Sequence, residues 1–350
     1  MRSTPFRIVA TFYPRIWGKR SLAPIFPEKT GLSENIGEAW LTDARCVIAN
    51  GPFGAKTLAE AWRAMPAEWK GARCAEMEDF PLLVKFIFPT DKLSIQVHPD
   101  DAYASVHEAA AGGRGKTEMW HVVSAEQGAE LLLGLKSGVT KKQFAATIGS
   151  KSIEELFEVH PVEENNTFFV PPGVPHSIGG GVVVCEVQQY CDLTYRVYDY
   201  GRVDGHGKPR ELHIEKAMDV IRFGGPRVDR VRPLEWASQK MGISLLAACK
   251  YFATEKWRIA ELFTAKPKTD AFNLLAFLGG KGKIRWDGGM AHYHQGECWF
   301  MPASLHSYEL IPDEEETSLI RTFVPDLDLL RENLRALGVA EGKISDLVFA

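Results

Sequence analysis

Alternating apolar and polar side chains recur along the chain in short runs, and these runs predict β-strands. In an extended strand successive side chains point to opposite faces, and Gly and Pro bound each run. The predicted strands cover residues 82–88, 93–98, 117–123, 130–135, 167–170, 182–189, 195–198, 245–248, 257–262, 272–278, 283–286, 297–301 and 317–323. Many short strands separated by turns favour a sandwich or barrel over alternating strand–helix units.

Helices are expected at a few places between the strands, and three begin with a capping-box pattern. The three pairs are Thr57 and Glu60, Thr140 and Gln143, and Ser152 and Glu155. In each pair a hydroxyl and a carboxyl or amide group can satisfy free amides of the first helical turn. The last two pairs predict a small helical insert at about residues 137–160. Connecting helices are expected at 211–221 and 326–337.

The Gly-Gly-Pro sequence at 224–226 is the strongest break and sets the predicted domain boundary. A chain of 350 residues exceeds most single cores, so two domains are expected. The first, residues 1–225, contains the helical insert, and the second, residues 226–350, is a smaller β domain. Residues 300–307 weakly echo residues 169–177, which suggests two related β units.

Composition narrows the class of partners without identifying a function. The net charge is -4 and no basic block stands out, so nucleic acid is not an expected partner. No stretch approaches the ~20 apolar residues that span a bilayer, and the N-terminal residues do not resemble a signal peptide. The six scattered cysteines are typical of reduced thiols in a cytoplasmic protein. We expect a monomer or homodimer that binds a small molecule.

One predicted strand combines an apolar face with a face that could bind a metal. Ser94, Gln96 and His98 alternate with apolar residues, and Glu118 lies at the start of the next polar alternation. Imidazole, carboxylate and amide oxygen suit a divalent ion such as zinc, and His176 is the candidate further ligand. The alternative is a set of ordinary polar residues satisfied by hydrogen bonds, and spacing alone leaves both interpretations open.

Two charged residues also stand out from their surroundings. Lys85 interrupts the apolar run 82–88, so it either pairs with a charge in a polar cavity or lies on an edge strand. Arg196 follows Glu186 and Asp192 among aromatic residues, which indicates either the wall of a site or a structural Arg–Asp pair.

The histidines at 292, 294 and 306 offer a second candidate metal site, with Glu297 between them. His306 follows His294 too closely for the strands that usually separate such ligands. We therefore interpret residues 290–296 as a turn that leads into the Glu297 strand, and expect no metal in the second domain.

The chain resembles the type I mannose-6-phosphate isomerases, which are cupins, and in particular their shorter bacterial members. The resemblance rests on specific motifs that run in family order, above all Gln-x-His-Pro joined to a later Lys-x-Glu. The matching segments are residues 17–18, 37–40, 81–85, 93–101, 115–120, 172–177 and 195–199, with a further match at 252–257. The resemblance implies a mainly β fold of two cupin-type, jelly-roll β-barrels.

The resemblance also implies a role for each candidate residue. One zinc ion is expected, and its implied ligands are Gln96, His98, Glu118 and His176. Catalytic roles are implied for Arg196, Lys116 and Asp192, and substrate-binding roles for Lys85, Ser94 and Glu186.

The implied reaction interconverts mannose 6-phosphate and fructose 6-phosphate through an enediol(ate). The base could be Glu186, Lys116 or a metal-bound water; we favour Lys116, because burial lowers the pKa of a lysine. Two alternatives stay open: an isomerase of a related sugar or sugar phosphate, and a cupin that binds a sugar phosphate without turnover.

Overall fold

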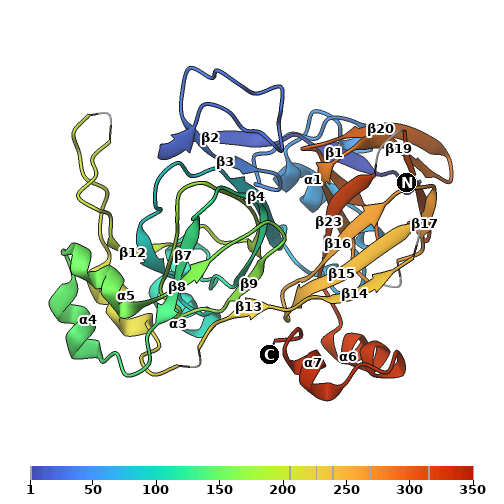
Figure 1. The fold of residues 1–350 in the computed structure, drawn as a ribbon. Helices are drawn as coiled ribbons and strands as arrows, with labels where there is room; N and C mark the ends of the chain where they lie inside the picture. Colours follow the sequence, from blue (N-terminus) through green and yellow to red (C-terminus); the bar gives the residue numbers. More distant parts are fainter. Residues whose placement is uncertain are drawn as a thin grey trace.

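Strands dominate the structure, a computed structural model that describes residues 2–204, 206–225, 227–238, 240–267, 270–313 and 316–349. Pro226, part of the predicted domain boundary, lies outside these residues. The strands form four sheets, which pair into two barrels that lie side by side (Figure 1). The predicted mainly β class is confirmed.

The first barrel consists of a seven-stranded and a five-stranded sheet. The larger sheet has the order β13-β9-β6-β11-β4-β3-β2, and the smaller has the order β12-β5-β10-β7-β8. The strands of the larger sheet are β2 (Thr11–Lys19), β3 (Ile36–Trp40), β4 (Leu82–Ile87), β6 (Glu118–Ala125), β9 (Thr167–Val170), β11 (Val182–Gln189) and β13 (Arg230–Val231). Those of the smaller sheet are β5 (Ile95–Val97), β7 (Glu130–Leu135), β8 (Phe157–Pro161), β10 (His176–Ile178) and β12 (Tyr195–Tyr198).

The second barrel pairs a seven-stranded with a four-stranded sheet, in the orders β1-β21-β18-β23-β16-β15-β14 and β17-β22-β19-β20. The larger sheet contains β1 (Phe6–Ile8), β14 (Leu234–Ala237), β15 (Met241–Ala248), β16 (Ala253–Ile259), β18 (Asn273–Gly279), β21 (Cys298–Met301) and β23 (Thr317–Phe323). The smaller contains β17 (Phe263–Ala265), β19 (Lys281–Trp286), β20 (Gly289–His294) and β22 (Tyr308–Pro312).

The two barrels repeat one strand order. If β21 is matched to β9, the remaining strands of the two larger sheets correspond one to one in the same order. In the smaller sheets, β17-β22-β19-β20 corresponds in order to β5-β10-β7-β8. β9 and β21 carry the two segments whose sequences echo each other. The barrels also exchange edge strands, because β1 pairs with β21 and β13 pairs with β9. Both exchanged strands cross the boundary predicted at residue 225.

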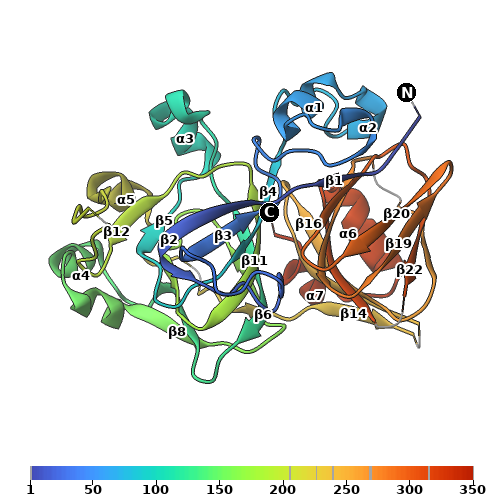
Figure 2. The same ribbon diagram turned by 90° about the horizontal axis from the view of Figure 1, so that it is seen from above.

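The largest hydrophobic core lies between the two barrels. Apolar residues of the first large sheet, such as Phe86 and Val187, belong to one cluster with Phe252, Phe300 and Ile320 of the second. Each barrel has a further core between its own two sheets. The large sheets therefore pack face to face, with a small sheet on the outer side of each; a second view shows the same side-by-side arrangement (Figure 2).

Helices lie around the barrels and only partly match the prediction. They are α1 (Leu58–Ala64), α2 (Ala67–Lys70), α3 (Asp101–His107), α4 (Lys141–Thr147), α5 (Ile214–Val220), α6 (Leu327–Ala336) and α7 (Glu341–Ser345), with 3-10 turns at Gly51–Phe53, Ala109–Ala111 and Lys151–Leu156. The capping boxes at Thr57 and Thr140 are confirmed. The box at Ser152 is wrong, because the Ser150 side chain caps a 3-10 turn there. The helix expected at 211–221 begins only at Ile214.

The outer face of the first small sheet explains the polarity of β5. Ile95 and Val97 pack in a cluster with Phe144 of α4 and Ala217 of α5, on the outside of the barrel. Because side chains alternate along a strand, Gln96 must point to the opposite side, into the barrel. The helices thus cover the apolar face of this strand, and its polar face is left for a site.

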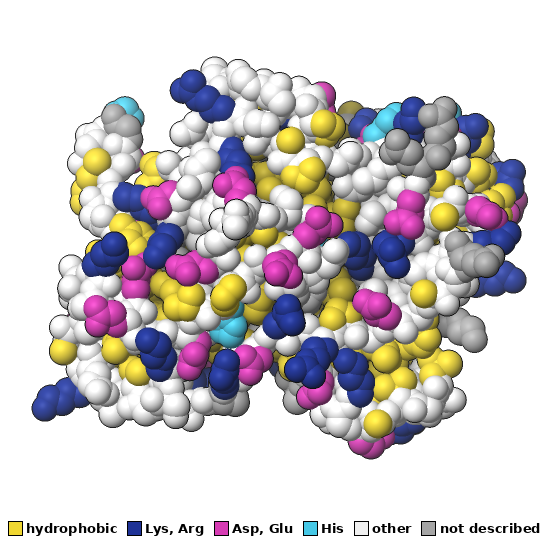
Figure 3. Space-filling view, in the orientation of Figure 1, with side chains coloured by type: hydrophobic (Ala, Val, Ile, Leu, Met, Phe, Trp, Pro, Cys, Tyr) yellow, Lys and Arg dark blue, Asp and Glu magenta, His cyan; other side chains and the backbone are white. Residues whose placement is uncertain are grey.

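Acidic and basic side chains are interspersed over the face of the molecule drawn in Figure 3. Hydrophobic side chains show between them, including a group over the region of α6 and α7, where Leu329 and Leu337 are exposed. Within the described ranges, no helix has both the length and the apolar character needed to cross a membrane.

Candidate active site

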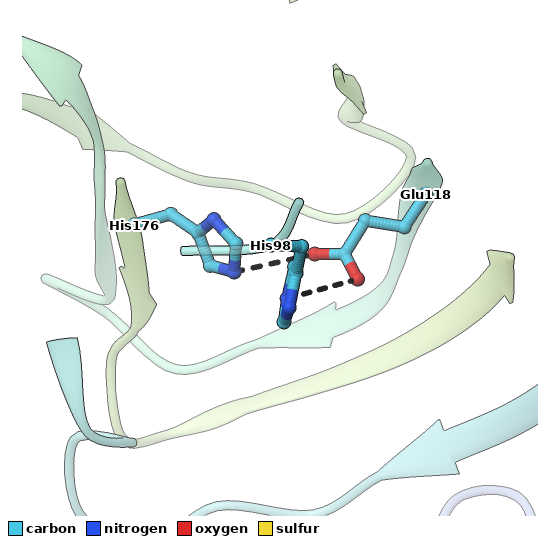
Figure 4. Close-up of side chains that lie close together, drawn as sticks. All are labelled: His98, Glu118 and His176. Atoms are coloured by element: carbon cyan, nitrogen blue, oxygen red, sulfur yellow. Dashed lines mark ion pairs between the residues drawn. The ribbon is translucent and has the colours of Figure 1, made fainter. Parts of the chain in front are cut away.

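Three potential metal ligands converge inside the first barrel. His98 follows β5, Glu118 is the first residue of β6, and His176 is the first residue of β10. β5 and β10 are neighbours, with His176 opposite Gln96. The potential ligand atoms of the three residues all lie within 4.8 Å of one another, and all three side chains are buried (Figure 4).

The backbone fixes the protonation of both imidazoles. His98 Nδ1 lies 2.8 Å from the carbonyl oxygen of Leu193, and His176 Nδ1 lies 2.9 Å from that of Val174. A carbonyl can only accept, so each Nδ1 carries the proton and each Nε2 presents a lone pair. Burial, reinforced by the charge of Lys116, lowers the pKa of both rings, that of His176 to about 4. Both histidines are therefore neutral, as metal ligands must be.

The carboxylate of Glu118 faces both of these lone pairs. Its Oε1 lies 3.3 Å from His176 Nε2, and its Oε2 lies 3.6 Å from His98 Nε2. Acceptors directed at one another in a buried site are unfavourable unless a cation lies between them. The Lys116 ammonium, 3.1 Å from His98 Nε2, meets the acceptors on that side, and Glu118 Oε1 still faces His176 Nε2. The three side chains therefore fit a divalent ion, and two imidazoles with a carboxylate are a typical zinc set.

Gln96 lies beside this cluster. Its Nε2 is placed 3.4 Å from His176 Nε2, and its Oε1 accepts a hydrogen bond of 3.3 Å from Ser94 Oγ. The two amide atoms exchange places when the amide rotates by 180°, which turns the oxygen toward the cluster. Gln96 is thus close enough for the ligand role that the sequence predicts, and that role stays a prediction.

A network of buried charges lies beside the histidines. Lys116 Nζ lies 2.6 Å from Glu118 Oε2 and 3.6 Å from Glu186 Oε1. Lys85 Nζ lies 3.1 Å from Glu186 and 3.9 Å from Glu38. β4, which carries Lys85, has β3 and β11 on its two sides. The edge-strand interpretation of Lys85 is therefore wrong, and its paired, buried role is confirmed.

The expectation that burial lowers the pKa of Lys116 is wrong. Burial does act in that direction, but the nearby carboxylates of Glu118 and Glu186 outweigh it and raise the pKa. The two carboxylates respond in opposite ways. Burial and the charge of Glu186 raise the pKa of Glu118 to about 7, whereas Lys85 and Lys116 overcome burial and lower the pKa of Glu186.

Lys85, Lys116 and Glu186 line one cavity with a volume of about 490 Å³. Ser94, Gln96, Lys116, Glu186, Asp192 and Arg196, all predicted site residues, contribute to its wall together with Lys85. Asp192 is exposed at the cavity, whereas Ser94 is buried. The predicted catalytic and substrate-binding residues thus lie around a single cavity beside the three potential metal ligands.

Arg196 is a cation of this cavity whose bonding partners carry no charge. Its Nε donates to Ser94 Oγ at 3.3 Å, and its Nη1 donates to the carbonyl oxygen of Glu211 at 2.9 Å. Asp199 instead pairs with Arg202 and Arg210. The alternative of a structural Arg–Asp pair at Arg196 is therefore wrong, and within the described ranges its positive charge is not neutralised by an ion pair.

Comparisons with known proteins agree with this geometry. Residues 6–125 match the family model "Phosphomannose isomerase type I, catalytic domain", and residues 243–323 match "Mannose-6-phosphate isomerase, cupin domain". The chain is 35% identical to a probable mannose-6-phosphate isomerase, GmuF, of Bacillus subtilis, over 87% of this chain and 96% of that protein. The chain belongs to the type I mannose-6-phosphate isomerases. The predicted family is confirmed, and the protein is an enzyme of this class.

Solved structures place the isomerase in the same fold. The mannose 6-phosphate isomerase of Bacillus subtilis matches with a TM-score of 0.82 and 29% identity, over 92% of this chain and 99% of that one. The Salmonella typhimurium enzyme, solved with fructose 6-phosphate and zinc, matches with a TM-score of 0.73 and 15% identity, over 92% of this chain and 100% of that one. At 15% identity the likeness shows the fold alone.

Sequence reasoning missed several residues that line the cavity of the isomerase. They are Arg15, Trp17, Glu38, Arg210 and His213. Glu38 accepts from Arg15 at 2.5 Å and from the Trp40 indole at 3.1 Å. Its segment, residues 37–40, was available as a family match, but nothing in its spacing indicated a cavity.

The histidines of the second barrel lie elsewhere. Residues 289–294 form the strand β20, so the predicted turn at 290–296 is wrong for most of its length. His292, His294 and His306 are exposed. His294 Nδ1 lies 3.7 Å from Glu297 Oε1, a contact at the surface of the isomerase.

Proposed function

We propose that this isomerase interconverts mannose 6-phosphate and fructose 6-phosphate with one zinc ion bound by Gln96, His98, Glu118 and His176. The observation that carries the proposal is the convergence of two imidazole lone pairs on a buried carboxylate at the edge of a charged cavity. Zinc bound there would act as a Lewis acid toward the sugar oxygens of C1 and C2. The zinc and fructose 6-phosphate found with the Salmonella typhimurium enzyme support this choice of metal and sugar.

The chain's own residues supply the proton transfer in this proposal. The C2–H bond breaks and a C1–H bond forms, the hydroxyl proton of the C2 oxygen is lost and the C1 oxygen gains one, and an enediol(ate) lies between the two sugars. Glu186 and Lys116 lie 3.6 Å apart in the cavity. We propose that Glu186, an ionised carboxylate because its pKa is lowered, carries the proton between the two carbons, and that Lys116, protonated because its pKa is raised, donates to the sugar oxygens. Lys116 also places a positive charge where the enediolate oxygens develop negative charge.

Arg196 is the proposed anchor of the phosphate. A phosphate dianion is bound best by a guanidinium that is not already neutralised, and Arg196 has only uncharged hydrogen-bond partners. Ser94 and Asp192 line the same cavity, and we assign them to the sugar hydroxyls. This arrangement would place the sugar chain between the metal cluster and Arg196.

The same proposal extends to the rest of the chain. We assign catalysis to residues 1–225 and structural support, without a metal, to residues 226–350. All six cysteines are free thiols, which supports a cytoplasmic location. The expectation of a monomer or homodimer without a nucleic-acid partner stays a prediction.

The test compares metal-stripped and zinc-restored protein in the conversion of fructose 6-phosphate to mannose 6-phosphate. Turnover should disappear with the metal, return with zinc, and be absent from Glu118→Ala at every zinc concentration. Zinc-independent turnover would overturn the metal assignment. Zinc binding and sugar-phosphate binding without turnover would instead establish a non-catalytic cupin, and turnover of another sugar alone would overturn the substrate.

A further inference from the structure

Asp101 connects the segments that carry two of the three potential metal ligands, His98 and Glu118. It lies three residues after His98, and its Oδ1 accepts a hydrogen bond of 2.8 Å from the amide of Gly115, three residues before Glu118. The same oxygen accepts a hydrogen bond of 3.1 Å from Gln189 Nε2. One carboxylate oxygen therefore joins the segment of one ligand to the segment of another.

The segment from Gly115 to Thr117 is held by three further backbone contacts. Gln189 Oε1 accepts from the Thr117 amide at 2.8 Å, and the Gln189 amide donates to the Thr117 carbonyl at 3.2 Å. The Lys116 amide donates to the carbonyl of Pro99 at 3.0 Å. The position of Lys116 and of the adjoining ligand thus depends on how firmly Asp101 and Gln189 are themselves held.

The second barrel holds the other oxygen of Asp101. Tyr251, in the turn between β15 and β16, donates its hydroxyl hydrogen to Asp101 Oδ2. Lys250 Nζ lies 3.8 Å from the same oxygen and 4.8 Å from the centre of the Tyr251 ring. Burial and the hydrogen bond to Asp101 raise the pKa of Tyr251, so that its hydroxyl remains a donor at neutral pH.

We propose that Tyr251 is a positioning residue of the active site, through which the second barrel fixes the segment of Lys116 and Glu118 relative to that of His98. Tyr251 touches no ligand itself and acts through Asp101. Groups that orient metal ligands typically change metal affinity or activity by about 10–100-fold when they are removed. The inference rests on the proposed function, because it treats His98 and Glu118 as zinc ligands.

The test is Tyr251→Phe, which removes one hydroxyl and keeps the ring. The matched control is Tyr293→Phe, because Tyr293 is a buried residue of the same barrel whose hydroxyl bonds Thr317 at 2.6 Å. Zinc affinity is measured by competition with a chelator, and amide exchange is measured on the metal-free proteins. Asp101→Asn is a second variant that weakens the same connection from its other side.

We expect Tyr251→Phe to bind zinc about tenfold more weakly, to exchange the amides of Gly115 and Thr117 faster, and to lose kcat with KM changed less than about twofold. Tyr293→Phe should lose stability only. The positioning role is overturned if Tyr251→Phe matches the control in zinc affinity and in exchange. A wild-type protein that binds no zinc would overturn the proposed function instead, and amide exchange would still decide whether Tyr251 holds the segment.

Discussion

The two barrels share a strand order but place opposite charges at matching positions. In the first, Lys85 on β4 faces Glu186 on β11. In the second, Glu255 on β16 faces Arg321 on β23, with Arg321 Nη1 2.8 Å from Glu255 Oε2. The cation and the carboxylate have exchanged strands, so an ion pair is retained at this position, buried in the first barrel and half-buried in the second, while its direction is reversed.

The positions of the potential metal ligands in the first barrel carry different residues in the second. Glu118 begins β6 and Asn273 begins β18, each opposite the last residue of the neighbouring β9 or β21. His176 begins β10, and Tyr308 begins β22. Asn273 accepts a hydrogen bond of 2.7 Å from Arg321 Nε, which occupies the acceptor that a metal would need. At the matched positions, the first barrel brings unprotonated nitrogen and carboxylate oxygen together, as the proposed metal site requires, and the second barrel has an amide and a phenol there.

Each barrel also has a cavity at this place, and the two differ in surroundings. The second, of about 300 Å³, includes Glu255 and Arg321, but its wall also contains Leu329, Leu330 and Asn333 of α6. The first is larger and lined by many charged groups. Barrels with the same strand order therefore have a cavity at the same place, and the side chains that line each cavity determine its chemistry.

The largest effect should come from substitution of Glu118, when it is compared with substitution of Asn273 at the matched position of the second barrel. Glu118→Gln removes the carboxylate charge, so zinc affinity and turnover should each fall at least ~100-fold. Asn273→Ser in the second barrel should change turnover by less than about twofold. Zinc titration and steady-state kinetics on both variants test this, and equal losses would show that the second barrel takes part in the chemistry.

Breaking the matched ion pairs should separate activity from stability. Arg321→Met leaves the half-buried Glu255 without its cation, so the free energy of unfolding should fall by about 2 kcal/mol with kcat unchanged. Lys85→Met should lose a similar amount and also lose turnover, because Lys85 lines the active-site cavity. Urea unfolding and kinetics are the measurements, and a Lys85→Met enzyme with full turnover would contradict the difference.

The contact between the barrels should be sensitive to acid through His121. This side chain lies on the β6 face that packs against the second barrel, and burial, with a smaller effect of Lys256, lowers its pKa to about 3. The unfolded value is ~6.5, so the unfolded chain binds a proton that the folded protein excludes, and stability falls as the pH falls below ~6.5.

From pH 7.5 to 5.0 the metal-free wild type should lose about 2 kcal/mol more than His121→Gln. Urea unfolding at the two pH values measures the difference. Other histidines titrate in both proteins and cancel in the comparison, so equal losses would show that His121 does not carry the acid sensitivity.

The smallest effect should come from the helix caps, one beside each barrel. Thr140 begins α4 with a capping box, and the Asp326 side chain accepts from two amides at the start of α6. Thr140→Ala and Asp326→Ala should each cost about 1 kcal/mol in thermal or urea unfolding, with turnover unchanged. A loss of turnover in Asp326→Ala alone would connect the second cavity to catalysis.

Many of the candidate site residues could be predicted from the sequence because they lie close together along the chain. Gln96 and His98 alternate along one strand, and Glu118 follows Lys116 by two residues, so a period of two marks them as candidates. The spacing left their role open, and the family resemblance supplied it. Glu38 and Arg15 were missed because they meet only when β2 and β3 pair. The charge state of Lys116 was wrong because it depends on two carboxylates rather than on burial alone.

The fold was readable to a similar extent. β7 and β11 were predicted with their observed bounds, because each is a largely apolar run rich in Leu or Val and ended by turn residues. β2 was missed because Pro14 and Gly18 interrupt its pattern, and β3 because Gly, Glu and Ala, which are depleted in strands, form its centre. β20 was mistaken for a turn although Asp287-Gly288, a strong hairpin signal, precedes it.

The exchange of β1 has a consequence for how the chain is made. Phe6–Ile8 pairs with β21 on one side, and on the other side Ile8 bridges Ile48, so its partner strand in the sheet follows it by nearly 300 residues. Contacts of such long sequence separation form late and slowly. Until β21 is available, one edge of β1 lacks its strand partner, which is the hazard of an unpaired edge strand. The pairing of β1 with β21 is therefore expected among the last contacts of the two barrels to form.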